Sequence, residues 1–478
     1  MDRQDAKTPR KDRKEGSFGR GRDGEPRSWK AVLGGLAAWR WTCLFIAVPV
    51  FAVAAPLEVL KEVPSTFVYP TNGFLPFNIH RGTQTMLSLM LPGCSFDDPR
   101  GVACALLKSD HNPQDPNNDV VVTCIGVNSG AGEIVYNVGL KDIRRFGKTG
   151  HGEGQFFHPT GAAIHPDGRV AIADTGNNRI CFLKHDGLRM AWVKTAGKAG
   201  NAPGHFAGPM GVAFDSQGNL YIADTGNDRI QVMTPSGRFR VLPTPRLEGP
   251  SAIAVIDAHE AWTFYPQGPY ADRLAVIDRQ GRRLQTLSLA GSPLAQAEAA
   301  AIPDGPVKLN DCAFDYFGNV VATDGLKDCL RKFDKDLHYL VTFGGPGGDD
   351  FQFNEPRGIA INHQFGQVLV SEKDSVQYFW NGADALDPKV ELSGTGFRIP
   401  FFLTERALVT AQVLDGAARP VTTLALKQDL ELGRQELDWT PDPSVVSGNY
   451  SLLLHVMATY SSRDRIEKQI SIPFSYIK

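Results

Sequence analysis

The sequence predicts an all-β protein in which a six-bladed β-propeller is followed by a β-sandwich. Three observations lead to this prediction. The segments Pro159–Ile180 and Pro209–Ile230 are near copies offset by 50 residues, a period typical of repeat architectures. Short apolar runs alternate with turns inside each copy. After residue 392 the repeat stops, and a new series of evenly spaced strands begins.

One copy of the repeat shows how its elements arise. Apolar runs at 211–214, 220–223 and 229–233 are too short for helices and are rich in β-forming residues. The segments 215–219 and 224–228 between them carry Asp, Asn, Ser and Gly, which favour chain reversals. Each copy is therefore predicted to be a small antiparallel sheet.

More divergent copies extend the repeat to six, over residues 95–392. They begin at Pro99, Pro250 and Pro356, and a further one contains the Asp315–Asp324 turn region. A four-stranded sheet alone leaves both edges and an apolar face exposed. We therefore expect the six sheets to pack radially in a propeller. A linear solenoid is the alternative, but it needs polar caps that the sequence does not show.

The repeat resembles the NHL repeat. The resemblance rests on Pro-Met-Gly-Val-Ala at 209–213 and on Asn-Leu-Tyr-Ile-Ala-Asp-Thr-Gly-Asn at 219–227. It is clearest over 147–240 and weakest over 247–290. The family fold is a six-bladed propeller, so the resemblance implies that fold and leaves the chemistry open.

The N-terminal region is typical of a targeting segment. Residues 1–30 are predicted to be a disordered basic leader, and 31–56 are apolar apart from Arg40. This pattern fits a signal peptide or an N-terminal membrane anchor (a transmembrane helix). Both place the remainder outside the cytoplasm, so the protein would be secreted, periplasmic or membrane-anchored. Residues 57–94 are a lead-in segment that could supply a ring-closing strand.

The charge of the exported body argues against a nucleic-acid partner. The whole chain has a formal charge of −2, and residues 1–54 hold eleven basic and six acidic side chains, so their removal leaves −7. Binding to nucleic-acid phosphates needs clustered Lys and Arg. We expect a protein or an anionic ligand as the partner.

The cysteines allow one disulfide. Cys104 and Cys124 fall on neighbouring strands of the first sheet and could pair, or could stay free thiols. Cys312 and Cys329 fall on a first and a third strand, too far apart to pair. We expect Cys94, Cys181 and this second pair to be free.

Residues 397–478 alternate apolar and polar side chains over short runs, which predicts a β-sandwich. They resemble the immunoglobulin-like domain of flagellar hook-capping proteins at Phe401–Leu403, Ala407–Thr410, Leu437–Trp439 and Ser447–Tyr450. The resemblance implies a module for attachment. Trp439 and Tyr450 are expected in its core.

The candidate binding residues lie in the Pro-x-Gly segments and the positions before them. In propellers these segments and the Asp-Thr-Gly-Asn turns emerge at one end of the channel, so their variable residues would form a binding rim. Arg100 and Arg357, from the first and last sheets, could clamp an anion, or could instead pair with Asp98, Glu355 or Glu372. The predicted rim comprises Asp98, Arg100, His158, Thr160, Met210, Ser251, Lys308, Asn310, Glu355 and Arg357.

The repeated polar residues of the turns are expected to be structural. Asp174, Asp224 and Asp324 should bond local backbone N–H groups as Asx-turns, since the same motif recurs in several copies. Arg179 and Arg229 should brace neighbouring sheets.

No catalytic residue, resident cofactor or zinc site is predicted, because only one rim position, His158, is a histidine. The oxygen-rich loop 110–119 leaves a weak case for a divalent metal such as calcium. The sequence thus favours a non-catalytic binding or scaffolding protein. The alternative is a metal-dependent propeller enzyme, a lyase or lactonase-type hydrolase, with its site at the channel mouth.

Overall fold

The structure is a computed structural model that describes residues 67–68, 80–108, 122–139, 142–257, 272–298, 301–303, 305–363, 366–459 and 467–478. The predicted leader, the signal peptide or anchor, and the 110–119 loop lie outside these residues. No helix within them is long and apolar enough to cross a membrane. Strands dominate this part of the chain, beside α1 (Gln84–Met90) and the short 3-10 helices η2 (Thr175–Asn177) and η3 (Thr225–Asn227), so the predicted all-β class is confirmed.

The described residues up to Asn381 form six antiparallel sheets. The first three are meanders of four consecutive strands. The first holds β3 (Pro99–Ala105), β4 (Thr123–Asn128), β5 (Glu133–Val138) and β6 (Asp142–Phe146). The second holds β7 (Ala162–Ile164), β8 (Arg169–Asp174), β9 (Arg179–His185) and β10 (Met190–Ala196). The third holds β11 (Pro209–Phe214), β12 (Leu220–Asp224), β13 (Arg229–Met233) and β14 (Phe239–Val241).

The next three sheets follow the same plan, and the last one also recruits strands from the N-terminal side. The fourth holds β15 (Pro250–Ile256), β16 (Arg273–Asp278), β17 (Arg283–Ser288) and β18 (Pro293–Glu298). The fifth holds β19 (Leu309–Phe314), β20 (Val320–Asp324), β21 (Cys329–Phe333) and β22 (Tyr339–Phe343). The sixth holds β23 (Gly358–Asn362), β24 (Gln367–Ser371) and β25 (Ser375–Asn381), with β1 (Phe67–Val68) and β2 (Arg81–Thr83) on β25.

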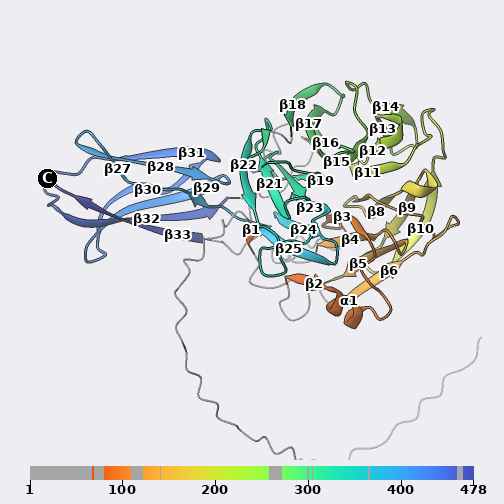
Figure 1. The fold of residues 1–478 in the computed structure, drawn as a ribbon, viewed down its shortest axis with the longest axis horizontal. Coiled ribbons are helices and arrows are strands. Elements are labelled where there is room, and N and C mark those ends of the chain that lie inside the picture. The colour runs from red at the N-terminus through yellow and green to blue at the C-terminus, as the bar shows by residue number, and fades with distance from the viewer. Residues whose placement is uncertain are drawn as a thin grey trace, which may run out of the picture. The chain divides into compact units, whose positions relative to one another are not determined.

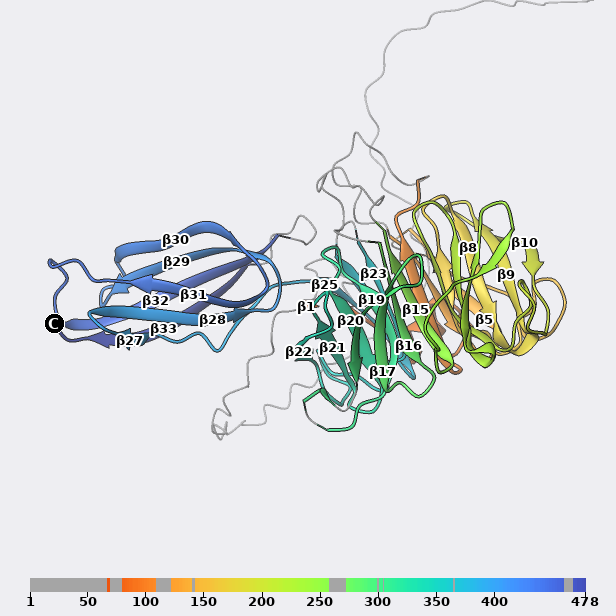
Figure 2. The same cartoon turned by 90° about the horizontal axis from the view of Figure 1, so that it is seen from above.

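The first strands of successive sheets contact one another in a closed order. β3 contacts β7, the contacts continue through β11, β15 and β19 to β23, and β23 contacts β3 again. Figure 1 shows these inner strands around a common centre, with the colour running from orange to cyan around it. In the turned view of Figure 2, β15, β19 and β23 lie side by side. A closed order is a β-propeller and excludes the open stack of a solenoid.

Each pair of neighbouring sheets encloses an apolar cluster, which explains why the single sheets are stable. Ile125 and Val127 of the first sheet pack with Val170 and Ile172 of the second. The later interfaces repeat this arrangement. The last cluster joins the first sheet to the sixth, through residues that include Val102, Cys124, Leu369 and Tyr378. Burial of each apolar face against the next is the main favourable term that holds the ring together.

The residues after Asn381 form two further sheets around one core. One holds β26 (Ala385–Leu386), β27 (Glu391–Ser393), β28 (Gly396–Leu403) and β31 (Gly433–Trp439). The other holds β29 (Ala407–Asp415), β30 (Pro420–Leu430), β32 (Gly448–Ala458) and β33 (Glu467–Tyr476). Figure 1 shows β27, β28 and β31 in one layer and β32 and β33 in the other.

Alternating side chains of these two sheets build the core, as the sequence pattern predicts. Trp439 and Tyr450 are buried in it with ring centroids 6.1 Å apart, which confirms their expected packing. β26 and β27 also pair with β28. The second pair of sheets therefore begins at Ala385, within the residues that the sequence assigned to the propeller (95–392). β26 has two residues and β27 has three, which is too short to show an alternating pattern in the sequence.

Three charged side chains are fully buried near the end of β21. Lys332 lies 2.5 Å from Glu405, which follows β28, and 3.6 Å from Asp315, which follows β19. Glu405 also accepts hydrogen bonds from Asn381 Nδ2 (3.0 Å) and the Arg406 N–H (3.0 Å). Burial and the Glu405 charge raise the pKa of Asp315, although Lys332 opposes this shift. Removal of one charge from such a buried group leaves the others unpaired and lowers the stability of the fold.

Candidate functional site at the channel mouth

The inner strands enclose a cavity of about 310 Å³ along the channel. The channel mouth is the end at which these strands begin, formed by the Pro-x-Gly segments. Seven of the ten predicted rim residues line the cavity, namely Arg100, Thr160, Met210, Ser251, Lys308, Asn310 and Arg357. Asp98, His158 and Glu355 are not among its lining residues. The propeller geometry thus brings together residues that lie up to 257 positions apart.

The position before each proline is held in a special backbone conformation. Asp98, His158 and Glu355 have φ near +50°, and the equivalent Gly208 and Gly249 have φ of 56° and 61°. A left-handed backbone conformation suits glycine and costs other residues free energy. Contacts with neighbouring residues must therefore stabilise this conformation.

Side chains of the preceding sheet supply that support. The Asn178 and Asp228 side chains each accept a hydrogen bond of 2.8 Å from the N–H of Gly208 and Gly249, respectively. Asp328 does the same for the Glu355 N–H at 2.6 Å. At these three positions, a sheet therefore fixes the entry to the next one.

The glycine of Pro-x-Gly is required because the next inner strand approaches its backbone. A Cβ atom on Gly161 would lie 2.2 Å from the Met210 carbonyl oxygen. The same contact recurs around the ring, and a Cβ on Gly358 in the last sheet would lie 2.6 Å from the carbonyl oxygen of Arg100 in the first. We call the third position of Pro-x-Gly the glycine slot. The residue in this slot sets the distance between neighbouring inner strands of the channel wall.

We expect Gly161→Ala to lower the free energy of unfolding by about 2 kcal/mol, because the added methyl group overpacks the contact between two inner strands. Urea denaturation followed by fluorescence measures the change. Gly345→Ala is the control, since nothing lies within 4 Å of a Cβ at that position. Equal stability of the two variants would contradict the proposed role of the slot.

Asp311 occupies the glycine slot of the fifth repeat, which the sequence analysis did not single out. Its carboxylate accepts hydrogen bonds from the Cys312 N–H (2.9 Å) and, across the interface, from the Ile359 N–H (3.2 Å). Burial raises the pKa of Asp311 to about 7, although both hydrogen bonds favour the ionised form. The signal in the sequence was the replacement of a repeated glycine by an acid.

Hydroxyl groups link several pairs of neighbouring sheets. Thr175 and Thr225 Oγ1 donate to the carbonyl oxygens of Pro209 and Pro250, both at 2.7 Å. Between the last and first sheets a hydroxyl of strand β24 is used instead, since Ser371 Oγ donates to the Arg100 carbonyl at 2.5 Å.

Three polar rim residues donate hydrogen bonds to backbone carbonyl oxygens of the ring. Thr160 donates to the Met210 carbonyl (3.1 Å) and Asn310 to that of Pro356 (2.9 Å). Ser251 donates to the Asp278 carbonyl (3.0 Å). These side chains therefore serve the backbone of the channel wall. Within the described residues, the hydrogen bonds of Ser251 go to the carbonyl oxygens of Ile277 and Asp278, and neither is a base that could activate a nucleophile.

The repeated aspartates are structural, but the expected Asx-turn is wrong for two of them. Asp174 accepts a hydrogen bond from the Phe157 N–H (2.7 Å), 17 residues upstream, and pairs with Arg179 at 2.7 Å. Asp224 does the same with Ala207 and Arg229. The turn itself is a 3-10 helix that needs no side-chain cap.

At Asp324 the Asx-turn is present. Its Oδ1 accepts from the N–H groups of Leu326 (3.1 Å) and Lys327 (3.2 Å). The difference lies in the sequence after it, where Gly-Leu-Lys replaces Thr-Gly-Asn.

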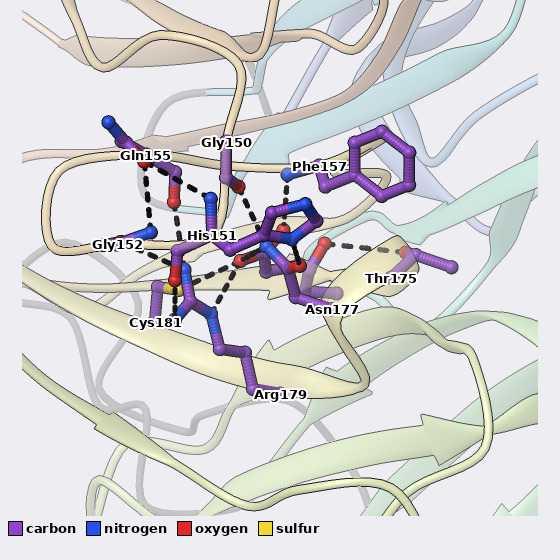
Figure 3. Close-up of polar contacts among 11 residues, drawn as sticks. Gly150, His151, Gly152, Gln155, Phe157, Thr175, Asn177, Arg179 and Cys181 are labelled. Atoms are coloured by element: carbon purple, nitrogen blue, oxygen red, sulfur yellow. Dashed lines mark hydrogen bonds and ion pairs between the residues drawn. The ribbon is translucent and has the colours of Figure 1, made fainter.

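Arg179 braces the loop that joins the first two sheets. Its guanidinium donates to the carbonyl oxygens of His151 (2.8 Å), Gly152 (3.1 Å) and Gln155 (2.9 Å), as Figure 3 shows. Arg229 makes the equivalent contacts one repeat later. Arg179 thus braces neighbouring sheets as expected. It does so by joining the connecting loop to Asp174.

The two rim arginines share one carboxylate. Asp98 lies 3.0 Å from Arg100 and 2.6 Å from Arg357, so the second pair joins the first and last sheets. Arg357 also pairs with Glu355 (3.2 Å), whose pKa is lowered by its hydrogen bonds from Lys373 and Arg357. Of the partners expected for the arginines, Glu372 binds Arg81 instead (2.8 Å).

The channel mouth carries an excess of positive charge. Arg279 and Lys308 line the cavity beside Arg100 and Arg357, and both have exposed side chains. Among the residues that the structure describes, neither side chain forms an ion pair. Arg279 was missed by the sequence analysis, because it follows Asp278 in the repeat that lacks the Asp-Thr-Gly-Asn turn.

The described residues give no support to a metal centre at the mouth. No group of three or more His, Cys, Asp and Glu side chains in this part of the chain is arranged to hold a metal ion. His158 is exposed, and its ring lies tilted against that of Phe157 with centroids 4.6 Å apart.

Comparison with known proteins identifies the repeats. A family model for the NHL repeat matches residues 156–181 and 206–233. A search of the curated proteins found no match. The chain therefore contains NHL repeats, and its closed order of sheets makes it a β-propeller protein.

Solved structures with a similar arrangement include three proteins. A streptogramin B lyase is 14% identical, with a TM-score of 0.39, over 60% of this chain and 94% of that one. A gluconolactonase from Xanthomonas campestris is 12% identical, with a TM-score of 0.41, over 67% and 99%. The β-propeller domain of Cps50 (Swd1) from Myceliophteria thermophila is 10% identical, with a TM-score of 0.38, over 60% and 98%. At these values the likenesses carry no argument about activity.

Proposed function

We propose that the protein is a non-catalytic binding or scaffolding module, a six-bladed NHL propeller whose channel mouth engages an anionic ligand or an acidic segment of a partner protein. The observation that carries the proposal is the exposed Arg279 and Lys308 beside Arg100, with no ion pair to neutralise the first two among the described residues. Cationic groups around a concave low-dielectric site attract anions and raise their association rate.

Four of the other polar groups at the mouth are committed to neighbouring protein groups, which supports a binding role over catalysis. Thr160, Ser251 and Asn310 donate to backbone carbonyl oxygens of the channel wall. Arg357 is committed to Asp98 and Glu355. A catalytic site needs a nucleophile or base whose hydrogen bonds lead to the substrate.

The flanking segments complete the proposal. Residues 31–56 would act as a signal peptide or membrane anchor that places the propeller outside the cytoplasm. The sheets after Ala385 would form an immunoglobulin-like module for attachment, since they enclose one core between two antiparallel sheets.

The binding test uses a fluorescein-labelled hexa-aspartate peptide and fluorescence anisotropy. We expect Arg279→Ala with Lys308→Ala to weaken binding about tenfold or more, because two charges that face the mouth are lost. Added salt should weaken binding to the unmodified chain.

The matched control is Arg238→Ala with Arg240→Ala, which removes two exposed charges at the outer strand β14. An equal loss in the control pair would mean that only net charge matters, and unchanged binding in the first pair would reject the mouth as the site. A stoichiometric metal ion in the purified chain, lost in His158→Ala or Glu355→Ala, would instead favour a metal-dependent lyase or lactonase-type hydrolase.

A further inference from the structure

Two cysteines face each other across the first sheet. Cys104 of β3 and Cys124 of β4 are direct partners in the antiparallel register. Both are free thiols in the structure, Cys124 buried and Cys104 partly exposed. Cys124 belongs to the apolar cluster between the first and sixth sheets, and Cys104 packs against the same cluster. The two side chains therefore lie on one face of the sheet.

The hydrogen bonds show which kind of cross-strand pair this is. The Cys124 N–H donates to Asn137 Oδ1 at 2.6 Å, and Asn137 belongs to β5, on the side of β4 away from β3. The N–H and C=O of one strand residue point to the same neighbouring strand. The Cys104–Cys124 pair is therefore a non-hydrogen-bonded pair of the β3–β4 ladder.

This type of pair has the spacing that a disulfide needs. Directly opposed residues at non-hydrogen-bonded positions have Cα atoms about 4.5 Å apart, with their side chains closer than at hydrogen-bonded positions. Disulfides span Cα distances of about 4.4–6.8 Å. The typical spacing of such a pair is therefore compatible with a disulfide.

We propose that Cys104 and Cys124 form a cross-strand disulfide that ties the innermost strand of the first sheet to its neighbour and closes the chain between them. No other pair of cysteines in the described residues is opposed in register. Cys312 is opposite Ala322, and Cys329 is opposite Asp324. The bond would persist in the oxidising compartment that the proposed export implies, so its occurrence in the cell rests on that part of the proposed function.

The disulfide forms by exchange with a low-molecular-weight disulfide such as oxidised glutathione. One cysteine thiolate attacks it and releases one glutathione thiol, and the second cysteine then displaces the other glutathione. The two protein thiols lose two electrons and two protons in total, and one oxidised glutathione becomes two reduced ones.

The surroundings of the thiols set when this exchange takes place. Burial raises the pKa of Cys104 to about 12 and that of Cys124 well above its ordinary value, so the reactive thiolate is scarce in the folded sheet. The exchange is therefore expected before the first and sixth sheets close over the pair.

The test uses the reduced full-length chain in a glutathione buffer of fixed potential, in native buffer and in urea below the unfolding midpoint. Samples are then blocked with N-ethylmaleimide under denaturing conditions, digested and analysed by mass spectrometry. We expect the Cys104 and Cys124 peptides to be linked, with a mass two hydrogens below that of the reduced pair, and to link at least tenfold more slowly in native buffer. Cys312 and Cys329 serve as internal controls and should be alkylated.

The melting temperature gives a second readout. The linked chain should melt about 5 °C or more above the reduced one, and Cys104→Ser with Cys124→Ser should remove this dependence on reductant. Alkylation of both thiols at oxidising potentials, linkage to a different cysteine, or equal melting temperatures would overturn the proposal. The buffer sets the potential directly, so such a result counts against the disulfide and leaves the proposed export untouched.

Discussion

Replacing Lys332 with methionine is expected to lower the free energy of unfolding by about 3–5 kcal/mol, the penalty for breaking a buried ion pair. The ammonium group lies 2.5 Å from Glu405 and 3.6 Å from Asp315, and all three side chains are at most 1% exposed. Without it, the two buried carboxylates lose the charge that pairs with both of them. Urea denaturation of the full chain, or a thermal scan, measures the loss.

The exposed pair of Lys373 with Glu355 provides the matched control for this prediction. Its side chains are 53% and 44% exposed, so Lys373→Met should change the stability by no more than about 0.5 kcal/mol. Glu405→Gln added to Lys332→Met should recover part of the loss, since it removes one of the uncompensated charges. Equal effects of the Lys332 and Lys373 substitutions would show that burial does not control the free energy of these pairs.

The second large effect is a dependence of stability on pH that arises from Asp311. Burial holds its pKa near 7 in the folded protein, whereas the unfolded chain loses this proton near the ordinary value of 3.8. Between these two values the folded state binds more protons than the unfolded state. A rise in pH through this window therefore lowers the free energy of unfolding. The free energy of unfolding falls by up to about 4 kcal/mol across this window. Water at the channel mouth that solvates the Asp311 carboxylate makes the fall smaller.

Asp311→Asn should remove this contribution, because the amide stays neutral at every pH and keeps an oxygen to accept from a backbone N–H. The free energy of unfolding, measured in urea between pH 4.5 and 8, should fall less steeply for the variant than for the unmodified chain. Asp315 contributes in the same direction to both proteins, so the difference between the two slopes isolates Asp311. An exposed substitution, Asp349→Asn, is the control. Parallel slopes for all three proteins would contradict the prediction.

Much of the candidate site could be predicted because the repeat reports its own geometry. The Pro-x-Gly offset located Arg100, Thr160, Met210, Ser251 and Arg357, and all of them line the channel. Their partners could not be read in the same way. Asp98 serves two arginines because the ring brings the first sheet against the last, a contact between residues 259 positions apart.

Two residues of the channel depart from the repeat pattern, and a search for matches to the pattern passes over them. Asp311 stands where four other copies have glycine, and Arg279 lies in a turn that has lost its motif. The structural role predicted for the aspartates of the intact turns agrees with their contacts. Their partners are backbone N–H groups of the connecting loop and not those of the turn itself. Asp174 bonds the Phe157 N–H, since the connecting loop folds back over the turn.

The sequence by itself determined the all-β class, the presence of repeats and the short strands within them, because β-propensity and turn residues act over a few neighbouring positions. Only the tertiary structure decided that β1 and β2 complete the last sheet, that Ser371 closes the ring on Arg100, and that Lys332 is buried between two carboxylates. The physical reason is range. These contacts join residues that are distant in the chain, and their burial and pKa shifts depend on what the closed ring excludes from water.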